Sequence, residues 1–211
     1  MGRVTAAEDK DQGGSTPPAG RRRRRDPERT RAVLVEALLD LVAEGEREPT
    51  RKAIAERAGV SERTVFVHFA DREALYVTAA EQQAERWRAL AVEVPPEWPV
   101  RRKVRALLDQ RGAMYEVMSP IRKVGLQLES ESPGLRRVMA EGDTWFRDDL
   151  ARTFAPELAL VSGARRPGGL LDSLEAASGW AAWDHLRARR GLDPTAAVTA
   201  LSRTLRALLE S

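Results

Sequence analysis

The stretch AGVSERTVFVHF, residues 58–69, places a turn signal directly before a short helix of unusual composition. Gly59 allows a backbone conformation that costs other residues energy, and Ser61 is a favourable N-cap for a helix. In the segment that follows, only Glu62 and Arg63 carry a full charge, and most of the remaining side chains are aromatic or β-branched. Such side chains are unfavourable on a water-exposed surface. The role of this helix must therefore be inferred together with the segments next to it.

A second short helix precedes this one. It is expected to start after a Thr50 N-cap and to end at Gly59. Two short helices joined by Ala-Gly-Val-Ser predict a helix-turn-helix unit, whose second helix lies in the major groove of DNA. The side chains expected to pack against the preceding helix are Ile54, Ala55, Val60, Val65 and Phe69. Those left on the outer surface are Glu62, Arg63, Thr64, Phe66, Val67 and His68.

This outer surface suits a DNA duplex. Phe66 and Val67 are poor choices for water, but they can contact thymine methyl groups and sugar edges. Thr50, Thr64 and Arg72 lie at expected helix starts, where hydroxyl, guanidinium and free N–H groups can reach phosphate oxygens. The alternative is a helical hairpin packed within a core, and the length of the spaced pattern favours DNA binding over it.

Composition excludes several classes of protein. The 211 residues suffice for one large domain or two small ones. Because there is no cysteine, a disulfide framework, a thiolate nucleophile and a cysteine-ligated metal are excluded, which fits a reducing cytosol. No apolar run reaches membrane-spanning length, and the N-terminus lacks the apolar stretch of a signal peptide. We therefore expect a soluble, cytoplasmic protein without a membrane partner.

The net charge of +3 is unevenly distributed. Seven basic and three acidic groups give residues 1–25 a charge of +4, so the other 186 residues carry −1. Overall charge thus gives no support to nucleic-acid binding by the globular part. A like-charge block can be a solvated tail or an arm that follows phosphates or enters a minor groove, and the helix-turn-helix favours the arm. The block consists of Arg21, Arg22, Arg23, Arg24 and Arg25.

The chain beyond the tail is expected to be all-α, because no alternating strand pattern or Asn-Gly hairpin signal occurs. A capping residue precedes proline at Asp26-Pro27, Ser119-Pro120, Ser132-Pro133 and Asp193-Pro194, which marks helix starts. Later helices are expected near 72–92, 100–118, 120–130, 133–154, 168–190 and 194–210. The predicted organisation is a disordered basic tail (1–25), a helix-turn-helix DNA-binding domain (26–80) and a helical effector-binding and dimerisation domain (81–211).

Residues 29–80 also contain ALLDLVAEGE followed by IAERAGVSERTVFVHFADREAL. This ordered run resembles the DNA-binding domain of the tetracycline-repressor (TetR) family of bacterial transcriptional regulators. The resemblance implies a homodimer that binds a palindromic double-stranded DNA operator. It also implies a larger helical C-terminal domain with a pocket for a small-molecule effector, whose binding releases the DNA. Repression is the family's common mode, and the sequence does not choose between repressor and activator.

The resemblance assigns roles to individual positions. Thr50 and Thr64 look like phosphate-binding hydroxyls, and Arg72 stands where a basic side chain commonly clamps the DNA backbone. Lys52 resembles a base- or phosphate-contacting position. Phe66 replaces a common tyrosine and Arg51 a common apolar residue, which alters the expected details of operator contact. The base-facing or groove-lining positions are Glu62, Arg63, Val67 and His68.

The C-terminal half suggests a dimer face and a pocket. In the family the last two helices pair with their copies in a four-helix bundle, and apolar stripes here suit that role; their spacing is equally that of intrachain core. The expected interface residues are Leu171, Leu174, Ala181, His185, Val198, Leu201, Leu205 and Leu208. Methionines and aromatics that suit a cavity for a largely apolar ligand, or an ordinary core, are Trp87, Met114, Tyr115, Met118, Trp145, Phe146 and Trp180.

Two other functions were weighed. An enzyme is disfavoured because the two histidines, His68 and His185, show no metal-ligand spacing, and no nucleophile, phosphate-loop or dinucleotide motif occurs. No cofactor and no metal are therefore expected. A DNA-binding regulator without an effector, controlled by a protein partner or by its own abundance, stays open as the alternative to a ligand-responsive repressor.

Overall fold

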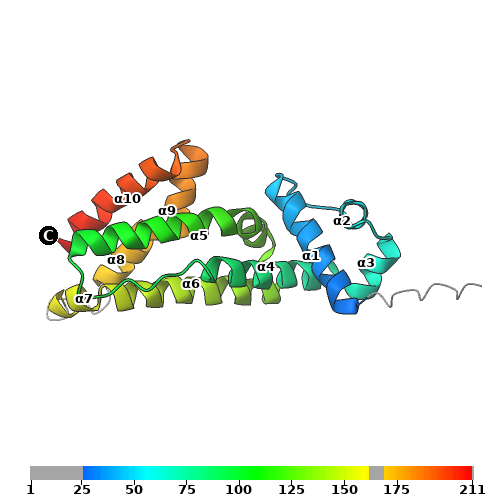
Figure 1. Cartoon of the computed structure of the whole chain (residues 1–211), viewed down its shortest axis with the longest axis horizontal. Helices are drawn as coiled ribbons and strands as arrows, with labels where there is room; N and C mark the ends of the chain where they lie inside the picture. The colour runs from blue at the N-terminus through cyan, green and yellow to red at the C-terminus, as the bar shows by residue number, and fades with distance from the viewer. Residues whose placement is uncertain (1–25, 162–168, 211) are drawn as a thin grey trace, which may run out of the picture.

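Helices make up the regular secondary structure of the chain. The computed structural model describes residues 26–161 and 169–210, and no β-strand occurs within these ranges. Figure 1 shows α1, α2 and α3 at one end of an elongated molecule and α7 and α10 at the other. The expected all-α fold is thereby confirmed. The α-helices are α1 (Pro27–Ala43), α2 (Arg51–Ala58), α3 (Glu62–His68), α4 (Arg72–Arg88), α5 (Val100–Leu128), α6 (Pro133–Thr153), α7 (Ala155–Val161), α8 (Gly169–Ser178), α9 (Trp180–Asp184) and α10 (Pro194–Leu209).

Capping residues before proline mark three of the four expected helix starts correctly. Asp26, Ser132 and Asp193 each accept a hydrogen bond from a backbone N–H of the first turn of α1, α6 and α10. The fourth expectation is wrong, because Pro120 lies inside the continuous helix α5. The Ser119 hydroxyl does not cap there; it donates to the Tyr115 carbonyl at 2.6 Å. Packing of α5 along α4 and α10 outweighs the local proline signal.

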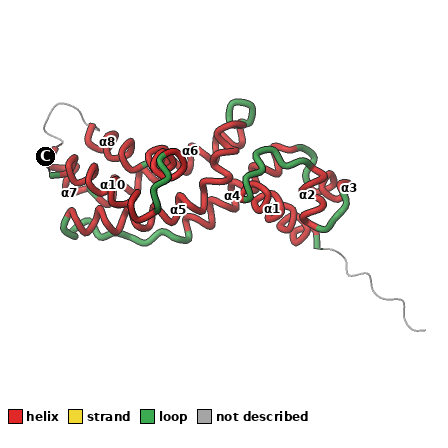
Figure 2. The backbone as a smooth tube through the Cα atoms, turned by 90° about the horizontal axis from the view of Figure 1, so that it is seen from above, coloured by secondary structure: helices red, strands yellow, loops and turns green. Residues whose placement is uncertain are grey.

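The segment expected as one helix over 168–190 is broken instead. Gly179 adopts an extended conformation between α8 and α9. After Asp184 the chain widens into a π-helix, η1 (His185–Arg189), before it turns toward α10. The short helix α7 was not expected from the sequence. Figure 2 shows from above that α8 and α10 lie at the end of the molecule opposite α3.

Two apolar clusters divide along α4. The first joins α1, α2, α3 and the N-terminal half of α4, and it extends to Ile121 and Val124 on α5 and to the start of α6. The second begins at Ala84 and holds the interior of the larger helical part. The changeover lies between Ala80 and Ala84, and the expected domain boundary after residue 80 stays a prediction. The first cluster crosses that boundary, so the three-helix end is packed directly onto α5 and α6.

The larger part also buries two cations. Lys103 is fully buried and donates to the Pro96 carbonyl at 2.9 Å and to Glu157 Oε2 at 2.6 Å. Arg111 donates to the Phe146 carbonyl at 2.6 Å and to Asp149 Oδ2 at 3.1 Å. Because a buried charge is tolerated only when it is paired, these contacts fix α5 against the helices that follow it.

Candidate nucleic-acid interface

Local hydrogen bonds define the turn between α2 and α3. The Thr50 hydroxyl accepts from the Ala53 N–H at 3.1 Å, which fixes the start of α2. Gly59 ends α2 with φ 64°, a left-handed conformation that glycine adopts without strain. The Ser61 hydroxyl then accepts from the Thr64 N–H at 3.2 Å and starts α3. The expected helix-turn-helix is present, with both caps at the predicted residues.

The inner face of this unit packs as the sequence predicts. Ile54 and Ala55 of α2 are buried, as are Val65 of α3 and Phe69 directly after it. Val60, in the turn, is partly buried against the same cluster. With this face anchored against α1, the opposite face of α3 is turned to solvent.

That opposite face carries large apolar side chains in the open. Phe66 is 56% exposed and Val67 is 69% exposed, and both stand next to the exposed Arg63. Exposed apolar side chains at neighbouring positions of one short helix suggest a contact surface, because exposed apolar patches commonly mark sites where a partner binds. Thr64 is half-buried and its hydroxyl lies 2.9 Å from that of Ser61.

Arg51 contacts the exposed ring of Phe66. Its guanidinium carbon lies 5.5 Å from the centre of the Phe66 ring, a cation–π arrangement between α2 and α3. The two departures from the family pattern, an arginine at 51 and a phenylalanine at 66, therefore contact each other. The sequence comparison, made position by position, did not indicate this contact.

A hollow of about 320 Å³ lies where the N-terminal ends of α2 and α4 meet. Thr50, Arg51 and Arg72 line it, so three groups able to bind phosphate lie together. Arg72 also donates to the Tyr76 hydroxyl at 3.2 Å, which orients its guanidinium. Glu48 and Asp71 line the same hollow and partly offset its positive charge.

Other proposed DNA-contacting residues occupy different settings. Lys52 is exposed and lies 3.9 Å from Glu56, one turn along α2. Glu62 is exposed at the start of α3, and His68 is half-buried at its end. The block from Arg21 to Arg25 lies outside the described residues.

Arg31 is a residue that sequence reasoning missed. Its guanidinium lies 4.2 Å from the centre of the Phe69 ring and donates to the His68 carbonyl and to the Thr78 hydroxyl. It thereby joins α1 to the end of α3 and to α4. No local pattern indicated this role, because its partners lie 37 and 47 residues away in the sequence.

The aromatic residues suggested as a pocket lie together in the larger part, but they are packed. The Trp87 ring stacks on Phe146 with centroids 4.8 Å apart, and Tyr115 is 5.2 Å from the same ring. Burial raises the pKa of the Tyr115 hydroxyl, which donates to the Ser178 carbonyl at 2.9 Å. Met114 and Met118 are buried in the same cluster, Trp145 is half-buried beside Trp87, and the Trp180 indole N–H donates to the Ser119 hydroxyl.

A small cavity of about 30 Å³ remains between α4, α5 and α6. Trp87 and Met118, both among the suggested pocket residues, line it together with Met139. Gln83 Oε1 and Arg122 Nε, two buried polar atoms without a hydrogen-bond partner, belong to residues that also line it. The volume is enough for little more than one or two water molecules.

The residues suggested as a dimer face are divided between interior and surface. Leu174, Val198, Leu201 and Leu205 are at most 5% exposed and pack within the subunit. Leu171 and Leu208 are half-buried, and Ala181 and His185 are exposed. The four buried side chains belong to the core of the subunit, which was the alternative interpretation of their spacing. Any dimer face on these helices would therefore use the exposed neighbours of these side chains.

Two negative findings concern the described residues only. Over 26–161 and 169–210, no helix is both long and apolar enough to cross a membrane. In the same ranges, no group of three or more histidine, cysteine or acidic side chains could hold a metal ion.

The geometry described above is that of a helix-turn-helix regulator fold. Residues 35–79 match the family model described as bacterial regulatory proteins, tetR family. The resemblance seen in the sequence motifs is thus confirmed over the helix-turn-helix itself. No protein of curated function matches the chain significantly.

Solved structures share the fold of nearly the whole chain. A transcriptional regulator from Rhodococcus sp. Rha1 superposes with a TM-score of 0.63 at 20% identity, covering 88% of this chain and 96% of its own. Salmonella enterica GusR gives 0.59 at 18% identity, covering 88% and 98%. The multidrug binding protein EbrR, complexed with imidazole, gives 0.57 at 23% identity, covering 85% and 96%. The fold is therefore the one that these solved transcriptional regulators share.

Proposed function

We propose that this protein is a DNA-binding transcriptional regulator that acts as a homodimer on a palindromic operator. The observation that carries the proposal is the exposure of Phe66 and Val67 on α3, the second helix of a helix-turn-helix. Their position suits entry of α3 into the major groove, where apolar side chains contact thymine methyl groups. The hollow lined by Thr50, Arg51 and Arg72 supplies phosphate contacts that would set the register.

The mode of regulation that we propose is release by a small, largely apolar effector. The cavity beside Trp87, Met118 and Met139 supports it, because methionine side chains can move to enlarge a site. The unpartnered Gln83 Oε1 and Arg122 Nε offer one acceptor and one donor to a ligand that enters. An enlarged cavity would displace α4, which leads directly into the helix-turn-helix, and so change the separation of the two α3 helices in a dimer.

A regulator without an effector is the second candidate. It is favoured by the close packing of the aromatic cluster, in which Trp87 stacks on Phe146 and only about 30 Å³ is open. In that case protein partners or the amount of the protein would control occupancy of the operator.

The experiment that tests the function is binding of the full chain to fluorescent duplexes from the intergenic DNA next to its own gene. The proposal predicts saturable binding to one of them at about 10⁻⁸ M or tighter, with a stoichiometry of two chains per duplex. A thermal-shift screen of apolar compounds then separates the two candidates: the effector model requires a compound that raises the melting temperature and weakens operator binding. Failure of every neighbouring duplex to compete against unrelated DNA would refute the function.

A further inference from the structure

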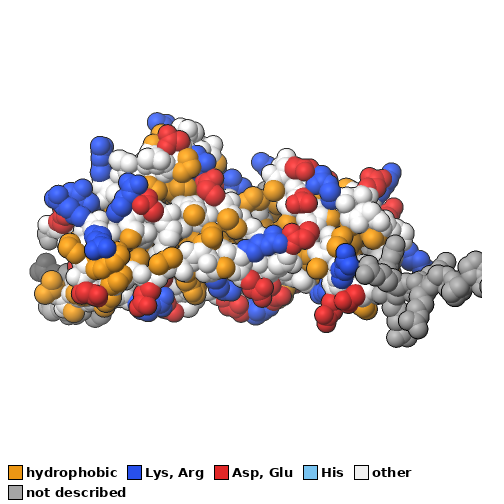
Figure 3. Space-filling view, viewed as in Figure 1, with side chains coloured by type: hydrophobic (Ala, Val, Ile, Leu, Met, Phe, Trp, Pro, Cys, Tyr) orange, Lys and Arg blue, Asp and Glu red, His pale blue; other side chains and the backbone are white. Residues whose placement is uncertain are grey.

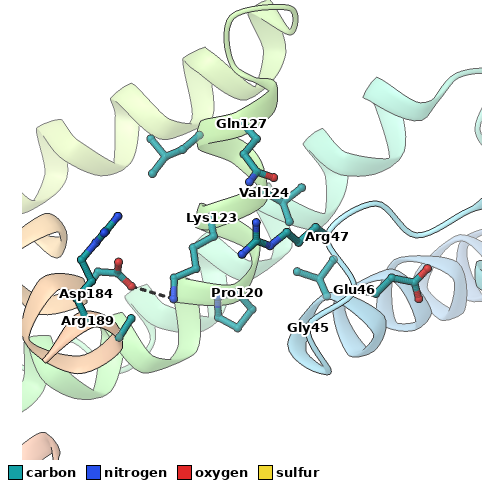
Figure 4. Close-up of a pocket in the computed structure, with 12 residues that line it drawn as sticks. Gly45, Glu46, Arg47, Pro120, Lys123, Val124, Gln127, Asp184 and Arg189 are labelled. Carbon is teal, nitrogen blue, oxygen red and sulfur yellow. Dashed lines mark ion pairs between the residues drawn. The ribbon is translucent and has the colours of Figure 1, made fainter. Parts of the chain in front are cut away.

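A cleft lies between the three-helix end and the larger helical part. It has a volume of about 520 Å³, within the range of small-molecule sites. Figure 4 shows three walls: the loop after α1 with Gly45 and Arg47, the middle of α5 with Pro120 and Lys123, and the α9–η1 junction with Asp184 and Arg189. It is separate from the cavity beside Trp87, which α4, α5 and α6 enclose.

Positive charge exceeds negative charge in this cleft. Lys123 is neutralised by Asp184, whose Oδ1 lies 2.9 Å from the Lys123 Nζ. Arg47 and Arg189 line the cleft from opposite walls, and neither has a hydrogen-bonded or ion-pair partner within the described part of the chain. Figure 4 shows that the Glu46 carboxylate points away from Lys123 and Asp184. Within the described residues, the cleft therefore presents two guanidinium groups without a hydrogen-bonded or ion-pair partner.

Part of the lining from α5 is apolar. Pro120, Val124 and Leu126 contribute it, and Leu126 is 41% exposed. An apolar lining together with two unpaired cations matches an amphipathic anion better than an inorganic one, because the body of the ligand would cover Leu126.

Both walls from the larger part are built on irregular helices. Pro120 interrupts the hydrogen bonding of α5 at the cleft, and Ala188 and Arg189 belong to the π-helix η1. π-helical turns are rare and occur frequently at functional sites. Two irregular helical segments thus line one cleft.

We propose that this cleft binds an organic anion with a compact apolar body, which Arg47 and Arg189 hold by charge-assisted hydrogen bonds over Leu126. The site is distinct from the effector pocket proposed above. A ligand here contacts both the loop after α1 and the larger part, so it ties the two ends of the molecule together.

Isothermal titration of the full chain with naphthalene-2,6-dicarboxylate tests the site. Arg47→Glu and Arg189→Glu should each weaken binding at least about tenfold, because a charge-assisted hydrogen bond is replaced by repulsion. Asp184→Asn should strengthen binding, because it removes a carboxylate and frees Lys123. Arg203→Glu, on the exposed side of α10, is the matched control and should leave binding unchanged.

The neutral diamide of the same ring system is the chemical control and should bind at least tenfold more weakly than the dicarboxylate. The proposal is overturned if the wild-type chain does not bind the dicarboxylate, if the diamide binds equally well, or if Arg203→Glu weakens binding as much as the cleft variants. Operator binding of the same proteins without ligand is measured in parallel. If the wild-type chain binds the dicarboxylate but no operator, the regulator function is refuted and the anion site stands. If it binds an operator but not the dicarboxylate, the anion site is refuted and the regulator function stands.

Discussion

Val67 allows the contribution of an α3 side chain to folding to be distinguished from its contribution to DNA binding. It is 69% exposed, so it adds little to the folded state, and its position on α3 directs it toward a DNA groove in the proposed complex. Stability and DNA affinity should therefore respond differently to its replacement.

Val67→Ser should leave the free energy of unfolding within about 0.5 kcal/mol of the wild type. It should weaken operator binding about tenfold, because contact with a thymine methyl group is lost. Chemical denaturation and fluorescence anisotropy measure the two quantities. Leu160→Ser is the control, since Leu160 is 86% exposed on α7, far from α3 in Figure 1; an equal loss of affinity in this variant would contradict the assignment.

Two buried glycines allow a matched test of packing. A Cβ added to Gly112 would lie 2.9 Å from Cη2 of Trp183, whereas one added to Gly142 would meet Trp87 at an ordinary 3.7 Å. Gly112→Ala should destabilise the protein by about 1–3 kcal/mol through overpacking. Gly142→Ala should stabilise it by up to about 1 kcal/mol through helix propensity. Thermal and denaturant unfolding measure the stability of the two variants. Equal changes of the same sign would show that the close approach of α5 and Trp183 does not contribute to stability.

At the residue scale, the sequence was informative where partners are close along the chain. Thr50, Gly59 and Ser61 could be assigned because a cap or a turn depends on the next few residues. The roles of Arg31, Lys103 and Arg111 could not be assigned in this way. Each of these side chains has a hydrogen-bond partner that lies 35 or more residues away in the sequence. Burial of a charge is decided by tertiary packing, which no local pattern encodes.

At the scale of elements, α5 and α7 are joined by the buried pair of Lys103 and Glu157. Glu157→Leu should destabilise the protein by about 3–5 kcal/mol, because it leaves the Lys103 ammonium buried without a counter-charge. Lys103→Met should be milder, and the double variant should be more stable than Glu157→Leu alone. Denaturant unfolding of the three variants measures this, and additive losses in the double variant would show that the two side chains do not depend on each other.

Glu116 joins α5 to η1 and gives a pH test of that contact. Arg187 donates hydrogen bonds to its carboxylate, as does Trp183, and they hold the pKa of Glu116 below its ordinary value of 4.5 despite partial burial. A lowered folded-state pKa means that the carboxylate stabilises the protein above its unfolded-state pKa, and that this stability is lost as the pH falls through the folded-state value.

Glu116→Gln should therefore be less stable than the wild type at neutral pH, and the difference should shrink as the pH falls below about 4.5. Urea unfolding between pH 3 and pH 7 gives the curves. Glu93→Gln, at an exposed position in the loop after α4, should show no such dependence. A stability difference between wild type and Glu116→Gln that is constant with pH would rule out the ion pair as its cause.

Helix boundaries were predictable where caps and breakers agree with packing, and not elsewhere. Pro133 and Pro194 start helices, but Pro120 lies within one, because α5 is long enough to gain more from packing than it loses from one missing hydrogen bond. The break at Gly179 and the π-helix after Asp184 have no clear signal in the sequence. They arise where the chain turns to bring Trp183 against Gly112 of α5.

At the scale of the whole molecule, the face seen in Figure 3 carries side chains of both charges. Figure 3 shows basic and acidic side chains interspersed along the visible face, in agreement with a charge of −1 outside the first 25 residues. The proposed DNA binding would thus depend on local placement on α2, α3 and α4 and not on a general positive field. The overall composition gave no indication of such a site, and the prediction of it comes from the spaced motif alone.

The two ends of the molecule are also packed against each other. The cluster around α1 continues into Ile121 and Val124 of α5, and in the proposed regulation these side-chain contacts would carry a shift of α5 to the helix-turn-helix. In the proposed dimer, such a shift changes the separation of the two α3 helices, and an operator with fixed half-site spacing detects it.

Hydroxyl-radical footprinting on the intergenic duplex that the protein binds tests the central claim most directly. The account predicts two symmetric protected half-sites on one face of the duplex, centred about 10 base pairs or a multiple of that apart, and their loss or weakening in Val67→Ser. A single unsymmetrical footprint, or protection that Val67→Ser leaves unchanged, would contradict a symmetric pair of α3 helices in successive major grooves.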